Sequence, residues 1–271
     1  MNAIVYSVYV ENGNLSNNYN FEQLKTSLKS LRSFNKNIPV KVYVCAPEAE
    51  DMYTLDYLSN SNTEFVLFDL EFDKRLTGGI YTRWTAHKWP NTLDAIKRFS
   101  LENVLYIDTD TFFQKDPESL FYKYGNTSHI WGKPDVEKNW PEKFELDYMG
   151  MNDGQQMVSS KTLAYLEDLI KTRDDLVYEM QEKYKGVDDD KLSIAIQYIY
   201  GQYAVSEFLI SIGNPLRHFD DEDVLVIVDT DKFDLAEYKD DITLVHFCNT
   251  NMERFDPDAY KVYLENNLSN Q

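Results

Sequence analysis

Short apolar runs alternate with helical segments over the first 110 residues of the chain. The apolar, β-branched runs predict strands at 3–10, 40–45, 63–69 and 103–107. Apolar residues at helical spacing predict a helix at 21–34, and two proline-marked starts predict helices at 47–58 and 91–100. Strands that alternate with helices form βαβ units, so we expect an α/β fold with a mostly parallel sheet and helices on both faces. Ligands of such sheets bind at the carboxyl ends of the strands.

The second half of the chain is less regular. Asp116 followed by Pro117 is typical of a helix start and predicts a helix at 117–123. The segment 125–148 has the composition of a long surface loop, and 149–159 that of a strand interrupted by an Asn-Asp-Gly turn at 152–154. Further helices are expected at 160–185, 191–203, 206–212 and from 256 onward, and further strands at 224–229 and 242–247. No repeat or linker divides the chain, so we expect residues 1–271 to form a single domain.

The charge balance narrows the possible ligands. The 271 residues include 46 acidic and 27 basic side chains, which gives a formal net charge of −19. This excess argues against a nucleic-acid groove, which needs clustered lysine and arginine, and against docking on anionic lipid. An anionic ligand would need a local source of positive charge. The hydrophobic fraction of 43% is that of a folded, globular chain.

The sequence also carries an expectation about location. The first ten residues lack the charged region and cleavage site of a signal peptide. No apolar run approaches the roughly 18 residues that a membrane span requires. We therefore expect a cytoplasmic protein without a membrane span.

Two aspartates follow the fourth predicted strand directly. Asp108 and Asp110 are separated only by Thr109, where an α/β sheet presents its ligand site. Residues i and i+2 of a strand share a face, so the two carboxylates can converge on a hard divalent cation such as Mg²⁺ or Mn²⁺. The same Asp-Thr-Asp string recurs at 229–231 after another apolar strand, and it is the competing candidate.

One resemblance of this motif is to haloacid-dehalogenase-like phosphatases, which carry an apolar strand followed by D-x-D-x-T. Residues 108–111 fit that string. Asp108 would then be the nucleophile and Asp110 a general acid. Those domains place the motif on the first strand, whereas three predicted strands precede it here, and the later lysine and paired-acid segment are absent.

A second resemblance covers most of the chain. The order of signals is similar to that of GT-A fold glycosyltransferases, above all the family containing glycogenin and bacterial lipopolysaccharide galactosyltransferases. A strand begins the chain, the basic residues Arg83, Lys88, Lys97 and Arg98 precede the D-x-D motif, and an Asp-Pro helix start follows it. An N-x-G segment at 152–154 and an apolar strand that ends in His246-Phe247 complete the order.

The chain departs from that family at two places. The glycine and lysine that follow the histidine in the family are missing from 248–254, where Arg254 is the available cation. The Asp-Gln segment that the family carries between the N-x-G segment and the histidine has no clear counterpart here. Gly201-Gln202 or Glu207 are the nearest candidates.

The resemblance implies a metal-dependent transfer of a sugar from a nucleotide-diphosphate sugar, UDP-linked rather than GDP-linked, to a glycan or other hydroxyl acceptor. Residues 1–115 would bind the donor and residues 116–271 the acceptor. An inactive nucleotide-sugar-binding module is a third interpretation. The implied site residues are Asp108, Asp110 and His246 for Mn²⁺ or Mg²⁺; Tyr9, Arg83, Lys88, Asp108, Thr109 and Asp110 for the donor; and Asp153 and Glu207 for base catalysis or the acceptor.

Overall fold

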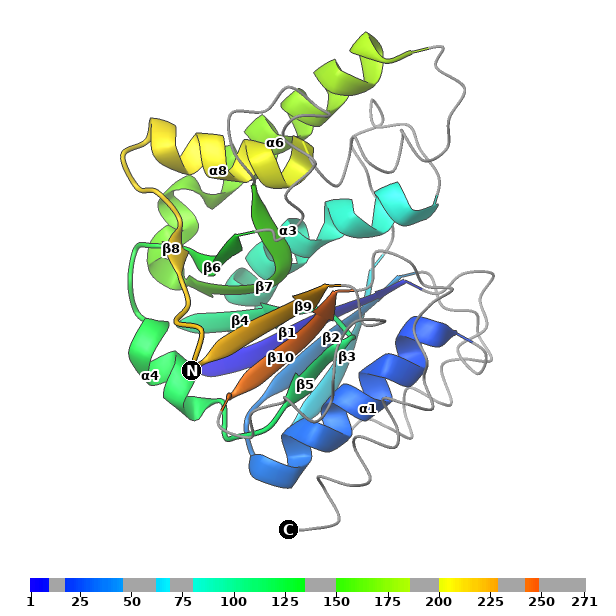
Figure 1. Cartoon of the computed structure of the whole chain (residues 1–271), viewed down its shortest axis with the longest axis vertical. Helices are drawn as coiled ribbons and strands as arrows, with labels where there is room; N and C mark the ends of the chain where they lie inside the picture. Colours follow the sequence, from blue (N-terminus) through cyan, green and yellow to red (C-terminus); the bar gives the residue numbers. More distant parts are fainter. Residues whose placement is uncertain are drawn as a thin grey trace.

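A seven-stranded sheet forms the centre of the computed structural model, in the order β3-β2-β1-β4-β7-β6-β8 (Figure 1). The structure describes residues 1–9, 18–45, 62–68, 80–134, 150–185, 200–228 and 242–248. The strands of this sheet are β1 (Asn2–Tyr9), β2 (Val40–Cys45), β3 (Thr63–Phe68), β4 (Asn103–Ile107), β6 (Trp131–Pro134), β7 (Met151–Ser159) and β8 (Arg217–His218).

The direction of the strands changes at β4. Strands β3, β2, β1 and β4 run parallel, as the βαβ pattern predicts. Strand β7 then pairs antiparallel with β4, β6 pairs antiparallel with β7, and β8 runs parallel to β6. The result is a mixed, mostly parallel sheet whose first four strands are all parallel. This confirms the predicted α/β fold class.

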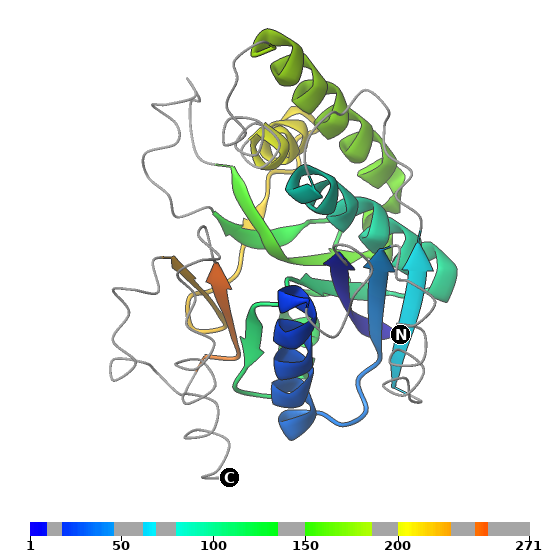
Figure 2. The same cartoon turned by 90° about the vertical axis from the view of Figure 1, so that its right-hand side faces the viewer.

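Helices and a second sheet cover the two faces of the large sheet (Figures 1 and 2). One face carries α1 and α4 together with a small sheet, and the other carries α3, α6 and α8. The helices are α1 (Tyr19–Phe34), α3 (Ile80–Phe99), α4 (Glu118–Tyr124), α6 (Leu163–Lys183, after a short 3₁₀ turn at Ser160–Thr162) and α8 (Gly201–Ser211). The small sheet has the order β5-β10-β9, with β5 (Thr111–Phe113), β10 (Leu244–Cys248) and β9 (Val224–Val228).

Strand alternation explains the two layers of the core. On β1, Ile4, Tyr6 and Val8 pack toward α1, whereas Ala3 and Val5 pack toward α3 and α6. Both faces of a central parallel strand are buried, so it reads as a continuous apolar run. The first strand is therefore recognisable in the sequence without a period of two.

Helix α3 continues through a proline, contrary to the prediction that the helix begins after it. Pro90 has no N–H to donate to the carbonyl of Ala86, four residues earlier. The buried guanidinium of Arg173 on α6 donates to that carbonyl instead, with Nη1 3.4 Å from the oxygen. The helix therefore extends back to Ile80, and Lys88 lies on an ordered turn just ahead of the proline.

Two predictions for the second half are also wrong. Strand β7 runs through 152–154 without a turn, and residues 153–155 form a bulge in its pairing with β6, where Gly132 pairs with Gln156 and Lys133 with Asn152. The expected surface loop at 125–148 contains a strand, β6. The predicted helix at 21–34 is confirmed as α1, while those at 47–58, 191–199 and from 256 onward lie outside the described residues.

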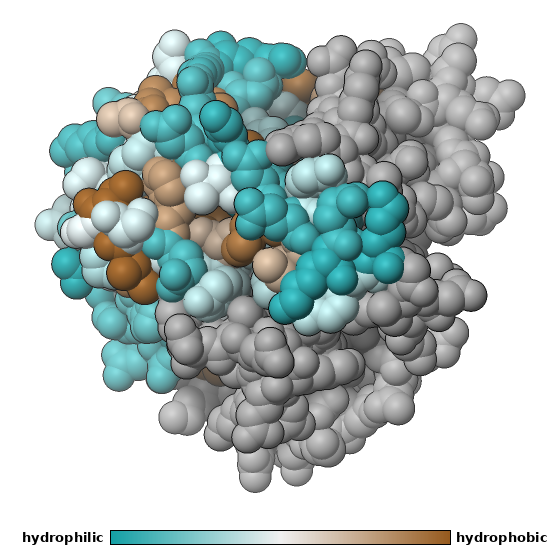
Figure 3. All heavy atoms as spheres, turned by 90° about the horizontal axis from the view of Figure 1, so that it is seen from above, coloured by the Kyte–Doolittle hydropathy of each residue, from teal (hydrophilic) through white to brown (hydrophobic). Residues whose placement is uncertain are grey.

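Five large hydrophobic side chains among the described residues are exposed: Met1, Leu67, Tyr122, Ile210 and Ile212. On the face seen in Figure 3, hydrophobic residues form small brown areas among hydrophilic ones. Among the described residues, no helix has the length and apolar character needed to cross a membrane.

Candidate functional site

The Asp-Thr-Asp segment after β4 forms a tight turn anchored on both sides. The backbone N–H of Asp108 donates to the carbonyl of Gly154 on β7, at 2.8 Å, and the carbonyl of Asp108 accepts from Thr111 N at 3.2 Å. The carbonyl of Asp110 accepts from Phe247 N on β10 at 3.0 Å. These bonds hold both aspartates at the carboxyl end of β4, where the sequence predicts the ligand site.

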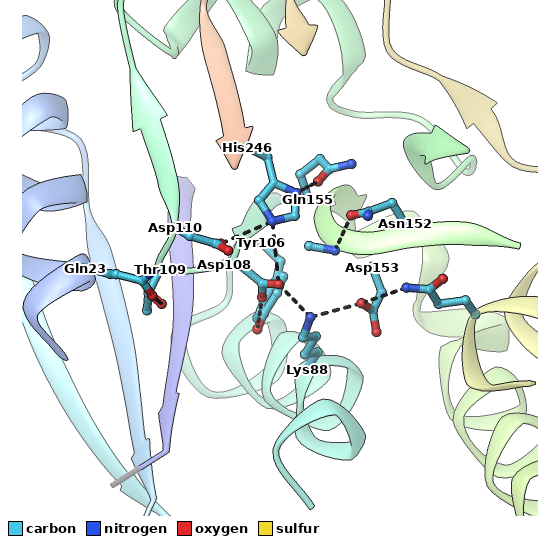
Figure 4. Close-up of polar contacts among 12 residues, drawn as sticks. Gln23, Lys88, Tyr106, Asp108, Thr109, Asp110, Asn152, Asp153, Gln155 and His246 are labelled. Atoms are coloured by element: carbon cyan, nitrogen blue, oxygen red, sulfur yellow. Dashed lines mark hydrogen bonds and ion pairs between the residues drawn. The ribbon is translucent and has the colours of Figure 1, made fainter. Parts of the chain in front are cut away.

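His246 approaches the two aspartates from β10. Its Nε2 lies 3.2 Å from Oδ1 of Asp110 and 4.0 Å from Oδ2 of Asp108 (Figure 4). One ligand atom from each of the three residues lies within 4.8 Å of the others. The antiparallel register that pairs His246 with Thr111 brings the histidine to the turn. The structure thus unites residues that are far apart in the sequence, as the resemblance implies.

Lys88 lies between two carboxylates below this group. Its Nζ is 2.7 Å from Oδ2 of Asp108 and 3.0 Å from Oδ1 of Asp153 on β7. Gln202 on α8 donates to the same oxygen of Asp153 at 3.3 Å, and Tyr106 donates to Oδ1 of Asp108 at 3.3 Å. Lysine 88 is fully buried, so its ammonium is engaged within the protein.

Burial and charge shift the pKa values of this group. Burial raises the pKa of Asp108 above its ordinary value, with Lys88 opposing the shift and Asp110 adding to it. Burial lowers the pKa of Lys88, but the charges of Asp108 and Asp153 outweigh it and hold that pKa well above its usual range. Burial likewise lowers the pKa of His246, and the charges of Asp110 and Asp108 raise it above its ordinary value.

The donor set fits a hard divalent cation. The two carboxylates suit both Mn²⁺ and Mg²⁺, and the imidazole nitrogen is better suited to Mn²⁺ than to Mg²⁺. Among the described residues, none makes a hydrogen bond of good geometry to the buried Oδ1 of Asp110, whose neighbour is the imidazole. Among the described residues of this cluster, Lys88 is one positive charge against the three carboxylates of Asp108, Asp110 and Asp153, so their charges sum to −2 when the imidazole is neutral.

The β7 bulge shapes the other side of the imidazole. Nδ1 of His246 lies 2.6 Å from Oε1 of Gln155, which is completely buried. A Cβ on Gly154 would lie 2.0 Å from Cε1 of the imidazole, so only glycine allows the ring to approach the strand this closely. Sequence reasoning missed Gln155 and Tyr106, although two adjacent glutamines inside a predicted strand are an available signal.

The remaining predicted site residues lie in three kinds of place. Thr109 turns toward α1, where its hydroxyl donates to Oε1 of Gln23 at 3.1 Å (Figure 4). Glu207 is on the exposed side of α8, whose buried side carries Gln202. The side chains of Tyr9 and Arg83 and the second Asp-Thr-Asp string at 229–231 lie outside the described residues.

Comparison with protein-family models gave no match, and comparison with curated proteins gave none. Solved structures do resemble the chain. The galactosyltransferase LgtC, in complex with donor and acceptor sugar analogs, is 13% identical with a TM-score of 0.56, over 99% of this chain and 96% of that one. Mouse xyloside xylosyltransferase 1 is 12% identical with a TM-score of 0.54, over 93% and 100%.

The glycosyltransferase GlyE from Streptococcus pneumoniae TIGR4 is also similar, at 13% identity and a TM-score of 0.54, over 98% of this chain and 60% of that one. At such identities the likeness shows the fold alone. The chain therefore has the GT-A glycosyltransferase fold, as the order of sequence signals predicts.

The close approach of Gly154 to the imidazole can be tested with alanine. Gly154→Ala should lower the free energy of unfolding by about 1–3 kcal/mol, because the new methyl group must displace the ring or the strand. Gly132→Ala on β6 is the control, because its Cβ would lie 3.1 Å from the flexible Cε of Met151. Urea unfolding of both variants measures the difference, and equal losses would contradict the packing argument.

The ion pairs of Lys88 make a second prediction. Lys88→Met leaves Asp108 and Asp153 buried without their cation and should lower the unfolding free energy by about 3–5 kcal/mol. The deficit should shrink as the pH falls, since protonation of Asp108 removes an unbalanced charge. Lys133→Met is the control, because its partner Asp221 is 94% exposed and the loss should be under about 1 kcal/mol. A pH-independent deficit would show that lost packing, not charge, is responsible.

Proposed function

We propose that this protein is a metal-dependent glycosyltransferase that moves a sugar from a nucleotide-diphosphate sugar, UDP-linked rather than GDP-linked, to a glycan or another hydroxyl acceptor. The observation that carries the proposal is the convergence of Asp108, Asp110 and His246 at the carboxyl end of β4 in a GT-A fold. LgtC, whose structure contains donor and acceptor sugar analogs, shares that fold along nearly its whole length.

The charge of the site supports a diphosphate donor. Mn²⁺ or Mg²⁺ would be held by Asp108, Asp110 and His246, and it would act as a Lewis acid that stabilises the departing nucleoside diphosphate. Asp110 is the least buried of the three side chains, so the cluster opens to ligand on its side. An acidic protein can bind an anionic donor in this way without a basic surface.

Lys88 has a supporting part in this proposal. It neutralises Asp108 and Asp153 and fixes the first of these carboxylates for the metal. Its bonds to Asp108 and Asp153 hold the ammonium inside the cluster. We assign donor binding to residues 1–115 and acceptor binding to residues 116–271, with Asp153, held by Gln202 of α8, at the boundary.

Asp153 remains the better placed of the two proposed catalytic carboxylates. It lies in the cluster beside Lys88, whereas Glu207 points away from the buried side of α8. A base must come within hydrogen-bond reach of the acceptor hydroxyl, so Glu207 can serve only an acceptor that extends to the exposed side of this helix. Arg83 and Tyr9 stay candidates for donor contacts, whereas the buried hydroxyl of Thr109 is bonded to Gln23 of α1.

Nucleotide binding tests the metal site directly. UDP with Mn²⁺ should raise the melting temperature of the protein, and UDP alone should raise it much less. Asp110→Asn should abolish the metal-dependent part of this shift, because it removes a charged ligand without touching the bonds of Lys88. Asp231→Asn, in the second Asp-Thr-Asp string, is the matched control and should behave like the unaltered protein.

Three outcomes of this experiment separate the alternatives. A loss in Asp231→Asn with an intact Asp110→Asn would mean that the metal belongs to the second string. Binding of UDP and Mn²⁺ without release of UDP from any UDP-sugar tested would identify an inactive binding module. Turnover of a phosphomonoester with no response to nucleoside diphosphates would support the phosphatase instead.

The raised pKa values predict how metal binding depends on pH. Mn²⁺ requires a neutral imidazole and an ionised carboxylate, and the pKa values of both His246 and Asp108 are raised in the metal-free protein. The affinity should therefore fall by about tenfold per pH unit below the pKa of His246, because one proton competes for Nε2. Isothermal titration over a pH series measures it. His246→Asn should bind Mn²⁺ more weakly, and its affinity should vary less with pH in that range. An equally steep pH dependence in this variant would exclude the histidine as the competing group.

A further inference from the structure

The imidazole of His246 has two nitrogens, and only one faces the aspartates. Nε2 lies beside Asp110, while Nδ1 lies 2.6 Å from Oε1 of Gln155. A neutral imidazole can bind a metal only through the nitrogen that carries no proton. Nε2 is therefore a ligand only when the proton is on Nδ1, and a buried Nδ1–H needs an acceptor.

We propose that Gln155 is a positioning residue that keeps the proton of His246 on Nδ1 and so presents Nε2 to the metal. This inference rests on the proposed function, because it assumes the metal site of Asp108, Asp110 and His246. It goes beyond that site by assigning the residue that selects the tautomer and fixes the plane of the ring.

The backbone holds Gln155 firmly in this position. Gln155 pairs with Ile107 in the β4–β7 ladder, one residue before Asp108. The orienting oxygen and the first metal ligand are therefore fixed in the same register. Gly154 completes the arrangement, because the absence of a side chain lets the ring lie against β7 within reach of the amide.

The orientation of the amide decides its effect. With Oε1 toward Nδ1, the glutamine accepts a proton and leaves Nε2 free for the metal. The reverse orientation would donate to Nδ1 and place the proton on Nε2, where it would block the metal. An ionised glutamate can only accept, so Gln155→Glu keeps the accepting orientation and removes the donating one.

The next residue supplies a matched control. Gln156 is also completely buried on β7, but it pairs with Tyr106 and belongs to the opposite face of the sheet. Among the described residues, none hydrogen-bonds to either atom of its side-chain amide. Gln156→Met therefore removes a buried amide from the same strand without touching the imidazole.

Binding of Mn²⁺ alone to the full chain, followed by electron paramagnetic resonance, tests the proposal. Gln155→Met should weaken Mn²⁺ binding by about 10- to 100-fold, the effect typical of losing an outer-shell partner of a histidine ligand. Gln155→Glu should bind at least as tightly as the unaltered protein, and Gln156→Met should bind equally. Unchanged affinity in Gln155→Met, or an equal loss in Gln155→Glu, would overturn the proposal.

A spectroscopic readout does not depend on the variants folding well. In the unaltered protein with Mg²⁺, ¹⁵N NMR should show a hydrogen-bonded proton on Nδ1 of His246 that exchanges slowly with water. Its absence would overturn the proposal. If the unaltered protein binds no Mn²⁺, the metal site and this inference both fail, whereas normal binding with an unaffected Gln155→Met defeats the inference alone.

Discussion

The buried negative charge at the end of β4 is the constraint on which this site depends. Asp108, Asp153 and His246 are almost inaccessible to water, and Lys88, the lysine that the described part of the chain brings to them, is already shared by two carboxylates. Removing charges from water costs several kcal/mol per ion unless they are paired. Lys88 removes part of the excess, and a divalent cation between Asp108, Asp110 and His246 would remove the rest. Lys88 comes from α3 and His246 from β10, so elements far apart in the sequence converge at the end of β4.

This constraint changes the meaning of the overall charge. A net charge of −19 argues against a protein that binds nucleic acid or another polyanion through a basic surface. It does not exclude an anionic ligand, because a cation held by three side chains can supply the attraction locally. Most of the acidic residues need no functional explanation. The few that matter are distinguished by burial, and composition alone cannot reveal which ones are buried.

The sequence predicts the parts of this structure that depend on local pattern. The parallel strands, α1 and the Asp-Thr-Asp turn follow from apolar runs and spacing, and the order of motifs predicts the GT-A fold. The errors have distant causes. Pro90 is a strong local signal for a helix start, and the Arg173 side chain from another helix overrides it by satisfying the carbonyl that proline leaves open. Likewise, Gln155 gains its importance only from a histidine contributed by the last described strand.

The bulge in β7 shows why the Asn-Asp-Gly segment misleads a reading based on turns. In a regular strand, residues 153 and 155 share one face and residue 154 occupies the other. Here Asp153 pairs with Lys88, while the consecutive residues Gly154 and Gln155 both meet the imidazole of His246. Two consecutive residues contact the same ring here because β7 departs from regular pairing opposite the Gly132–Lys133 step of β6. A composition typical of a turn therefore forms a bulge in this strand. In that bulge Asp153 pairs with Lys88, Gly154 leaves room for the imidazole of His246, and Gln155 orients it.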